Sequence, residues 1–343
     1  MTQGTVNRSP VMADVARIAG VSHQTVSRVL NGHPNVRAST RERVLAAIDQ
    51  LGYRRNLSAR ALVTRRTNTL GVVAFDTTLY GPASTLFGIE QAARDAGYFV
   101  SIVSLKTITR KNVDEALDYL TAQAVDGMIA IAPQIEAAAA VSRVPGHLPV
   151  VAVEGGEAGA TPVVAVDQVA GARLATQHLL DLGHRTVWHV AGPAEWLEAE
   201  GRTTGWQATL EQAGAPVPRL IQGDWSPRAG YEAGRAIAAD REAGAIFVGN
   251  DQMALGLLRA LTEAGIRVPD DISVVGFDDI PEAEFFSPPL TTVRQDFAEV
   301  GRRSIGLLLD LIESGSVGRD EHERIVVPPT LVTRKSTAPP TTA

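Results

Sequence analysis

The sequence contains no cysteine, and aromatic residues make up only 5% of it. Without cysteine there is no disulfide and no thiolate chemistry, which is compatible with a reducing cytoplasm. No apolar run is long enough to span a bilayer, and the first ten residues, MTQGTVNRSP, lack the apolar core of a signal peptide. We therefore expect a cytoplasmic protein, and its 343 residues suffice for two or three domains with cores of their own.

Signatures of catalysis are also missing from the sequence. The seven histidines are scattered along the chain and nowhere have the spacing of a metal site. No GxSxG elbow, P-loop or GxGxxG motif follows a predicted strand. Asp278 and Asp279 are consecutive acids whose side chains diverge, and we expect them to be solvated acids at the end of a strand. We expect no catalytic residues, no metal and no cofactor; turnover of a sugar by the purified protein would favour the alternative, an enzyme.

Positive charge is concentrated at the N-terminal end. Residues 1–66 contain eleven arginines, no lysine and three acids, which gives a net charge of +8. Because the whole chain has a net charge of −6, the remaining residues carry −14. A basic head on an acidic body indicates a polyanionic partner at one end of the chain. The partner we expect is double-stranded DNA of the nucleoid.

A helix-turn-helix is predicted over residues 12–31, which read MADVARIAGVSHQTVSRVLN. Apolar residues recur at helical spacing until Gly20 interrupts the run. Ser22 can then cap a second helix, which buries Val26 and Val29 and leaves polar residues on its other faces. Two short helices joined by such a turn form this motif, and polar groups at the start of the second helix are what major-groove reading requires. The alternative, a helical hairpin in an ordinary core, is disfavoured by the charge.

A third helix is predicted to begin at about Ser39, with Ser39 or Thr40 as its cap, and to end at Gly52. Its apolar stripe comprises Val44, Leu45, Ile48 and Leu51. Three helices would then enclose one small core.

The segment after this domain is predicted to be a hinge. Asn56 can cap a short helix over residues 57–63, which is too short to be stable alone. We expect it to fold when two copies of the chain meet over DNA, with Leu62 of each copy opening a base step in the minor groove. The alternative is a plain linker with Leu62 packed on the body of the protein.

From Thr69 onward, short apolar runs alternate with helical segments, as in a doubly wound parallel α/β sheet. Strands are expected in TLGVVAF, YFVSIVSL, DGMIAIAP, LPVVAVE, TVWHVAG, LIQGDW, AIFVGN, ISVVGFDD and RIVVPPTLVTR. Helices are expected over residues 82–96, 113–123, 171–182, 202–213, 228–239, 251–264 and 297–313. The two halves of this region are alike, and two facing halves would form a cleft at the carboxyl ends of their strands, where ligands bind in open sheets.

The predicted organisation has three parts: a helix-turn-helix domain at 1–55, a hinge helix and linker at 56–66, and a core at 67–343. Within the core, an N-terminal subdomain takes about 67–166 and 294–323, and a C-terminal subdomain about 167–293 and 324–336. The Thr/Pro/Ala-rich residues from about 336 to 343 are expected to be disordered.

These segments resemble the LacI/GalR family of bacterial repressors over about residues 11–335. DVARIAGVSHQTVSRVLN is similar to the family's N-terminal signature and NLSARALV to its hinge helix. GHRTVWHVAGP, GRTTGW, NDQMALGLLRAL, DISVVGFDD and PPLTTVRQDF are similar to motifs of its regulatory core. The resemblance implies an α-helical helix-turn-helix domain plus a periplasmic-binding-protein-like α/β core of two doubly wound subdomains. It also implies a homodimer that binds a pseudo-palindromic operator and responds to a small sugar-like effector in the cleft.

Roles in DNA binding are implied by the same resemblance. His23, Gln24 and Arg28 match base-reading positions; glutamine can pair bidentately with adenine and arginine with guanine. For His23 the alternative is a solvated surface histidine. The residues expected to hold the DNA backbone are Ser22, Thr25, Ser27, Asn31 and Tyr53, and those of the minor-groove hinge are Asn56 and Leu62.

The resemblance also implies a set of effector-binding residues: Asp167, Trp196, Glu198, Arg202, Trp225, Asn250, Gln252, Asp278 and Phe297. Arginine suits this role because its guanidinium presents a planar fork to vicinal hydroxyls. Trp225 would stack on the apolar face of a sugar. The alternative for Trp225 and Phe297 is core packing, and for Asp278 it is an acid in a turn at the end of a strand.

The sequence departs from the family pattern in places. The residues in the C-terminal half of the cleft resemble those of galactoside-binding members of the family. In the N-terminal half, Thr107 and Ile131 stand where such members have an arginine and an asparagine, and Asp167 fits the pattern of the broader family better. The last residues lack leucine heptads, so a dimer is expected. We favour a repressor of carbohydrate-utilisation genes that a sugar releases. The alternatives are a corepressor-dependent regulator that responds to a nucleobase and a sugar-transport protein, and the second of these would need a signal peptide.

Overall fold

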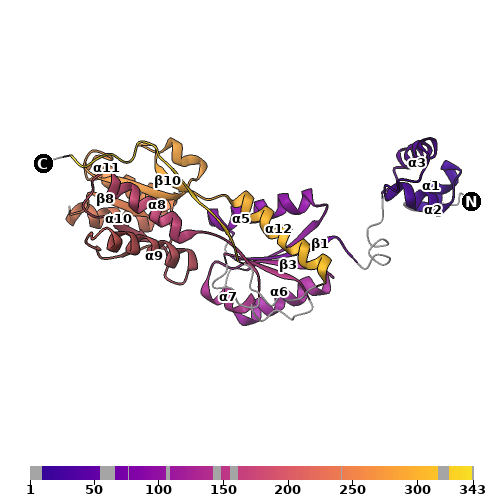
Figure 1. Ribbon diagram of the computed structural model, residues 1–343, viewed down its shortest axis with the longest axis horizontal. Coiled ribbons are helices and arrows are strands. Elements are labelled where there is room, and N and C mark those ends of the chain that lie inside the picture. Colours follow the sequence, from indigo (N-terminus) through magenta and orange to yellow (C-terminus); the bar gives the residue numbers. More distant parts are fainter. Residues whose placement is uncertain are drawn as a thin grey trace, which may run out of the picture. The chain divides into compact units, whose positions relative to one another are not determined.

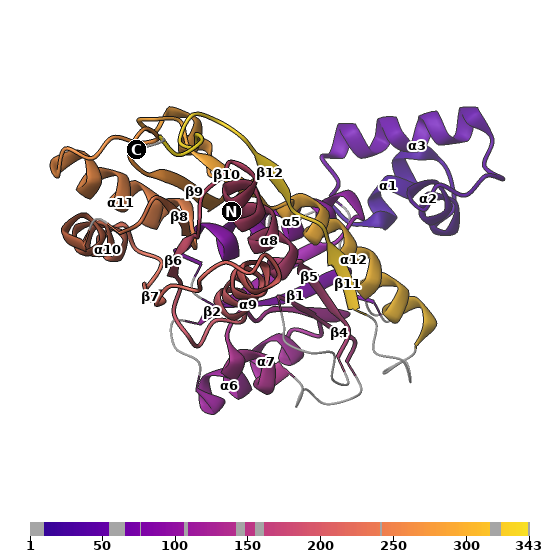
Figure 2. The ribbon, with the colours of Figure 1, turned by 60° about the vertical axis from the view of Figure 1, so that its left-hand side comes forward.

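The computed structural model describes residues 10–54, 66–75, 77–105, 109–141, 148–154, 161–240, 242–315 and 324–341. The chain divides into two compact units, Met1–Thr67 and Asn68–Ala343. The elements of both are labelled in Figure 1, and Figure 2 gives a second view. No helix in the described part is long and apolar enough to cross a membrane.

The first unit contains three helices, α1 (Met12–Ala19), α2 (His23–Leu30) and α3 (Ala38–Leu51). Gly20 adopts a left-handed conformation with φ 63°, which glycine tolerates because it has no Cβ. Ser22 caps α2 as expected, since its Oγ accepts a hydrogen bond from the Thr25 backbone N–H at 3.2 Å. The three helices enclose one small core that includes Val15, Val26 and Val44.

Two expectations for α3 are wrong. The helix begins at Ala38 with Arg37 at the N-cap position and no side-chain cap, so that Ser39 and Thr40 lie inside its first turn. Leu45 is 48% exposed instead of buried, because the inward-facing stripe of α3 passes through Val44 and Ala47.

The second unit, the core, has two lobes, each built on a six-stranded sheet. The first sheet has the order β11-β5-β4-β3-β1-β2, and all its strands are parallel. Its strands are β1 (Thr69–Phe75), β2 (Phe99–Leu105), β3 (Gly127–Ile131), β4 (Val150–Val153), β5 (Val163–Val166) and β11 (Arg324–Val327). Its helices are α5 (Tyr80–Asp95), α6 (Arg110–Ala122), α7 (Ile135–Val141) and α12 (Phe297–Ser314). Apolar side chains fill both faces of the sheet, which is why its strands read as continuous apolar runs.

The second sheet has the order β12-β10-β9-β8-β6-β7, and only β12 is antiparallel to its neighbour. Its strands are β6 (Trp188–Ala191), β7 (Ile221–Gln222), β8 (Ala245–Val248), β9 (Ser273–Asp278), β10 (Thr291–Arg294) and β12 (Thr330–Val332). Its helices are α8 (Gln168–Asp181), α9 (Leu197–Gln212), α10 (Pro227–Asp240), α11 (Asp251–Glu263) and the 3-10 helix η1 (Pro281–Phe285). The two doubly wound lobes confirm the expected fold class.

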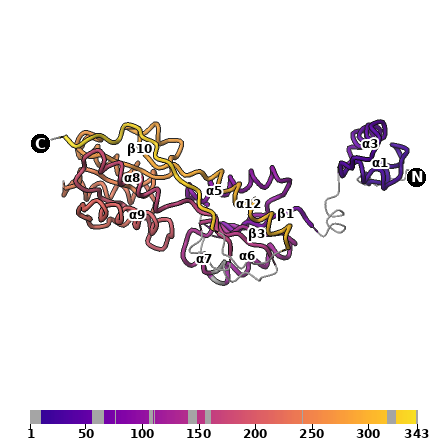
Figure 3. Tube along the Cα trace, in the orientation of Figure 1, coloured from indigo at the N-terminus to yellow at the C-terminus, as the bar shows by residue number. Residues whose placement is uncertain are grey.

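In its described part the chain crosses between the lobes three times: from β5 to α8, from β10 to α12, and from β11 to β12. The last crossing runs along the yellow end of the tube in Figure 3. It corrects one expectation, because RIVVPPTLVTR is not one strand of the second lobe. Arg324–Val327 pairs with β5 in the first sheet, the two prolines interrupt the ladder, and Thr330–Val332 pairs with β10 in the second.

Further expectations need correction. The strands β5 and β10 and the helix α7 were not expected, and the segment LIQGDW forms a strand only over Ile221–Gln222. The C-terminal residues that the structure describes, up to Thr341, are packed on the second lobe instead of being disordered. Ser336 is completely buried, where its backbone oxygen accepts from Val274 N at 2.8 Å and its Oγ accepts from Thr291 N at 2.8 Å.

Candidate functional site

The first candidate surface lies on α2. On this helix the side chains of His23, Gln24 and Arg28 are all exposed, as a base-reading helix requires. Thr25 is held by a hydrogen bond of 2.9 Å between its Oγ1 and Ser22 Oγ, and Asn31 Nδ2 donates to Ser27 Oγ at 3.4 Å.

The other predicted DNA contacts are not exposed on α2. Tyr53 is buried in the core of the first unit, with Val15 and Val44 among its neighbours in that cluster. Its ring therefore helps to hold the three helices together, and any contact to DNA would have to come from its edge. Asn56 and Leu62, the predicted hinge residues, lie outside the described residues.

The second candidate site is a cleft between the lobes of the core. Its walls include residues at the carboxyl ends of the second sheet, where Asn250 follows β8, Asp278 ends β9 and Gln295 follows β10. The first lobe contributes Tyr80 and its neighbours at the start of α5. The cavity measures about 20 Å³, which is room for one or two water molecules. A larger ligand would therefore have to separate the lobes.

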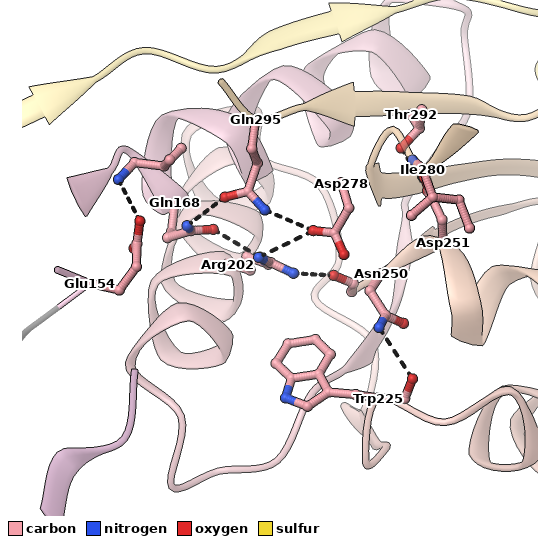
Figure 4. Close-up of polar contacts among 12 residues, drawn as sticks. Glu154, Gln168, Arg202, Trp225, Asn250, Asp251, Asp278, Ile280, Thr292 and Gln295 are labelled. Atoms are coloured by element: carbon pink, nitrogen blue, oxygen red, sulfur yellow. Dashed lines mark hydrogen bonds and ion pairs between the residues drawn. The ribbon is translucent and has the colours of Figure 1, made fainter. Parts of the chain in front are cut away.

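Arg202 is the centre of the polar network in this cleft (Figure 4). Its side chain is only 3% exposed and makes an ion pair of 3.7 Å with Asp278 Oδ1. Its Nε donates to Gln168 Oε1 at 2.9 Å, and its Nη1 donates to the backbone oxygen of Gly249. A buried guanidinium needs such partners because desolvation of an unpaired charge is costly.

Two glutamines close this network into a ring. Gln168 Nε2 donates to Gln295 Oε1 at 2.9 Å, and Gln295 Nε2 donates to Asp278 Oδ1 at 2.7 Å. Gln168 lies where the chain crosses from β5 to α8, and Gln295 where it crosses from β10 to α12. The ring therefore connects two of the crossings between the lobes to the charged pair of the cleft.

Aromatic side chains form the rest of the wall. The Arg202 guanidinium lies 5.2 Å from the centre of the Trp225 ring, and Trp196 meets Trp225 edge-on at 5.9 Å. Trp225 is 5% exposed, yet its indole N–H has no hydrogen-bond partner among the described residues. An unpaired buried donor is uncommon and is consistent with a site for an acceptor atom of a ligand.

The backbone at the cleft is strained. Trp225, Asp278, Asp279 and Glu154 are non-glycine residues with φ of 70°, 109°, 55° and 57°. Such conformations cost energy and are kept where the surrounding contacts enforce them, often at functional sites. Asp279 is held by Arg294 and Arg334, with oxygen–nitrogen distances of 2.6 Å to each. The two consecutive acids therefore diverge, as expected, but both are buried and paired instead of solvated.

The carboxyl groups of the cleft resist ionisation. Burial raises the pKa of Asp278 to about 6, although Arg202 and Gln295 act in the opposite direction. Burial and the charge of Glu154 raise the pKa of Glu198 to about 8. Burial likewise raises the pKa of Glu154 to about 7, against a hydrogen bond from the Val166 backbone N–H. The cleft therefore holds protonatable oxygens that can donate as well as accept hydrogen bonds near neutral pH.

The structure brings six of the nine predicted effector residues to the cavity wall: Trp196, Glu198, Arg202, Trp225, Asn250 and Asp278. Gln252 lies beside it and accepts from Asn250 Nδ2 at 3.0 Å. Phe297 packs edge-on against Tyr80 at 5.9 Å and borders a groove between α5 and α12 instead. Asp167 caps α8 by accepting from Ala170 N at 2.8 Å and lines a neighbouring groove.

Sequence reasoning missed Gln168, Gln295, Tyr80 and Glu154. Glu154 is the last residue of the predicted strand LPVVAVE, a position that could have been recognised. Gln295 and Gln168 follow the ends of β10 and β5, two strands that were not predicted, and Tyr80 reaches the cleft only through the packing of the lobes. Among the described residues, no group of histidine and acidic side chains could hold a metal ion.

An exposed recognition-type helix joined to a two-lobed α/β core defines a class of DNA-binding regulators. Two known protein families match parts of the chain. Residues 11–56 match the family described as "Bacterial regulatory proteins, lacI family", and residues 176–337 match the one described as "Periplasmic binding protein-like domain". The chain belongs to the LacI family of bacterial regulatory proteins, and its class is that of DNA-binding transcriptional repressors, not of enzymes.

Relatives cover nearly the whole chain. The "HTH-type transcriptional repressor PurR" of Haemophilus influenzae is 34% identical, over 94% of this chain and 97% of its own length. The "Lactose operon repressor" of Escherichia coli is also 34% identical, over 96% and 91%. A solved lac repressor dimer, bound to operator and the anti-inducer ONPF, has a TM-score of 0.85 at 34% identity, covering 96% of this chain and all of that one. A CelR–cellobiose complex has a TM-score of 0.71 at 30% identity, covering 95% and 99%.

Proposed function

We propose that this protein is a homodimeric repressor of carbohydrate-utilisation genes and that a sugar bound in the core cleft releases it from its operator. The observation that carries the choice of a sugar is the grouping of Arg202, Asp278 and Asn250 beside the Trp225 ring. Charged and amide groups can hydrogen-bond several hydroxyls at once, and an indole covers the apolar face of a sugar ring. A Lac repressor structure is described as bound to ONPG and a CelR structure as a cellobiose complex, and the second supports a sugar as the ligand class here.

In this proposal the first unit binds operator DNA. His23, Gln24 and Arg28 read base edges, while Ser22, Thr25, Ser27 and Asn31 position the helix on phosphates. A lac repressor structure described as a dimer bound to operator supports pairing of two chains over one operator.

The ring of Gln168, Arg202, Asp278 and Gln295 gives a physical route from a bound ligand to the relative angle of the lobes. A sugar that hydrogen-bonds Arg202 and Asp278 competes with the two glutamines for the same atoms. Because both glutamines lie on segments that cross between the lobes, loss of their bonds changes the relative angle of the lobes. Ligand and operator affinities must then be coupled reciprocally.

The test is operator binding by the full chain. Sequences bound from a random duplex library would supply an operator, and fluorescence anisotropy would measure its affinity with and without galactose, lactose, cellobiose and glucose. We expect a salt-sensitive specific complex that at least one sugar weakens. Failure to form a specific complex under any condition would refute the proposal.

A second candidate is a corepressor-dependent regulator that binds a nucleobase. It is favoured by the relatives named PurR and by Trp196, whose ring could stack on a base. Calorimetry with hypoxanthine, guanine and the same sugars separates the two candidates. Binding of a nucleobase that strengthens operator affinity would replace the sugar proposal.

A further inference from the structure

A backbone bridge joins the two lobes of the core in addition to the crossings of the chain. Gln134, in the loop between β3 and α7 of the first lobe, forms an antiparallel β-bridge with Trp196, in the loop between β6 and α9 of the second. We call this pairing the lobe bridge. Both loops follow the carboxyl end of a parallel strand, which is the edge where ligands bind in open α/β sheets.

Two hydrogen bonds make up the lobe bridge. The backbone N–H of Leu197 donates to the oxygen of Pro133 at 2.9 Å, and the N–H of Ile135 donates to the oxygen of Glu195 at 3.2 Å. Leu197 and Ile135 are the first residues of α9 and α7, and the first N–H groups of a helix have no acceptor within that helix. Water can replace both acceptors when the lobes part, so the lobe bridge can open without leaving an unpaired donor.

Trp196 connects the lobe bridge to the cleft. Its side chain is 4% exposed, lines the small cleft cavity and meets the Trp225 ring edge-on. From the first lobe, Leu79 and Tyr80 pack against the apolar cluster that includes both tryptophans. One wall of the cavity is therefore hydrogen-bonded through its backbone to the opposite lobe. Because the cavity measures only about 20 Å³, it has to widen for a ligand, and the lobes cannot part at Trp196 while the lobe bridge is intact.

We infer that the lobe bridge is a latch, which holds the cleft shut and must open before any ligand larger than water can enter. The latch acts before a ligand is bound, so the inference does not depend on whether that ligand is a sugar or a nucleobase. A core that is open for only a fraction of the time binds its ligand more weakly by that fraction. Each backbone hydrogen bond of this kind shifts such an equilibrium about two- to tenfold.

Proline substitution removes one bond of the lobe bridge at a time. Leu197 is the first residue of α9, where proline is favoured because the helix does not need this N–H. Trp196 before it has φ −96° and ψ 122°, within the extended region that a residue before proline prefers. Leu197→Pro therefore deletes the donor and keeps the helix. Leu197→Ala is the matched control, because it shortens the side chain but retains the N–H.

The readout is quenching of tryptophan fluorescence by acrylamide, in the full chain without added ligand. The four tryptophans are between 2% and 7% exposed, and two of them, Trp196 and Trp225, line the cleft cavity. Acrylamide is a small neutral molecule, so its access to these two rings reports opening of the cleft. We expect Leu197→Pro to be quenched about two- to tenfold more strongly than Leu197→Ala, and the double variant Ile135→Pro/Leu197→Pro more strongly still.

Circular dichroism and thermal unfolding check that the variants fold. Should Leu197→Pro not fold, Ile135→Pro against Ile135→Ala makes the same comparison at the other bond, because Ile135 is exposed at the start of α7. Equal quenching of the proline and alanine variants overturns the inference, and so does an unaltered chain that is quenched as strongly as the double variant. These measurements use neither sugar nor operator, so their failure is distinguishable from failure of the proposed function.

Discussion

The structure makes a strong prediction for Arg202. Replacement by methionine keeps much of the side-chain volume but removes the charge, so that buried Asp278 loses its ion pair and must either remain an unpaired charge or take up a proton. Gln168 Oε1 and the Gly249 oxygen lose their donor as well. Breaking a buried pair in this way typically costs about 3–5 kcal/mol. We therefore expect Arg202→Met to lower the free energy of unfolding of the core by about that amount.

The assay is urea unfolding of the core followed by far-ultraviolet circular dichroism. Arg219→Met is the control, since the pair of Arg219 with Asp240 is exposed on the surface and should be worth about 1 kcal/mol or less. The double variant Arg202→Met/Asp278→Asn removes both charges, so its loss should be clearly smaller than the sum of the two single losses. An Arg202→Met variant as stable as the control, or strictly additive losses, would refute this account of the cleft.

The remaining predictions concern DNA, coupling and pH. Arg28→Ala should weaken operator binding by roughly 1–3 kcal/mol and relax specificity at one base pair, measured by anisotropy with single-base operator variants; a uniform loss across all variants would contradict base reading. Gln295→Leu should reduce the effect of the effector on operator affinity by a larger factor than it reduces effector binding in calorimetry, because the ring that joins two crossings is broken; equal reductions would show that coupling takes another route. Burial lowers the pKa of His178 and His184, which hydrogen-bond Thr337 and Ala338 of the C-terminal segment. At these two positions the folded chain binds fewer protons than the unfolded chain, so the stability that the two histidines contribute falls as the pH drops below about 6.5, whereas the raised pKa values of Asp278, Glu154 and Glu198 act in the opposite direction. Replacing both histidines with asparagine should therefore shift the stability–pH curve toward greater relative stability below about pH 6.5, and an unchanged curve would disprove the assignment.

Much of the fold follows from local patterns in the sequence. The Ser22 cap, the Gly20 turn and the alternation of apolar runs with helices are set by neighbouring residues, and the structure has them where expected. The position of β11 was not predictable in this way. Arg324–Val327 and Thr330–Val332 differ little in composition, and only the partner strands place them in different lobes.

The cleft shows the same division between local and long-range information. Asn250 and Asp278 were predictable because each stands at the end of a buried strand. Glu154 gave the same signal at the end of LPVVAVE and was overlooked, whereas Gln168 gave none, since β5 was not predicted and its role depends on a hydrogen bond to Gln295, far away in the chain. The packed C-terminal residues escaped prediction for a related reason. Their composition is typical of disorder, but Ser336 inserts between backbone groups of β9 and β10.

The central claim is that a small molecule in the core cleft controls how tightly the first unit holds DNA. The most direct test is a titration of operator with the full chain, at fixed salt, in the absence and presence of a saturating sugar that calorimetry has shown to bind. The account predicts that the sugar lowers operator affinity by about 5- to 150-fold, the usual range of allosteric coupling, and that operator lowers sugar affinity by the same factor. Equal operator affinity with and without a bound sugar would contradict it.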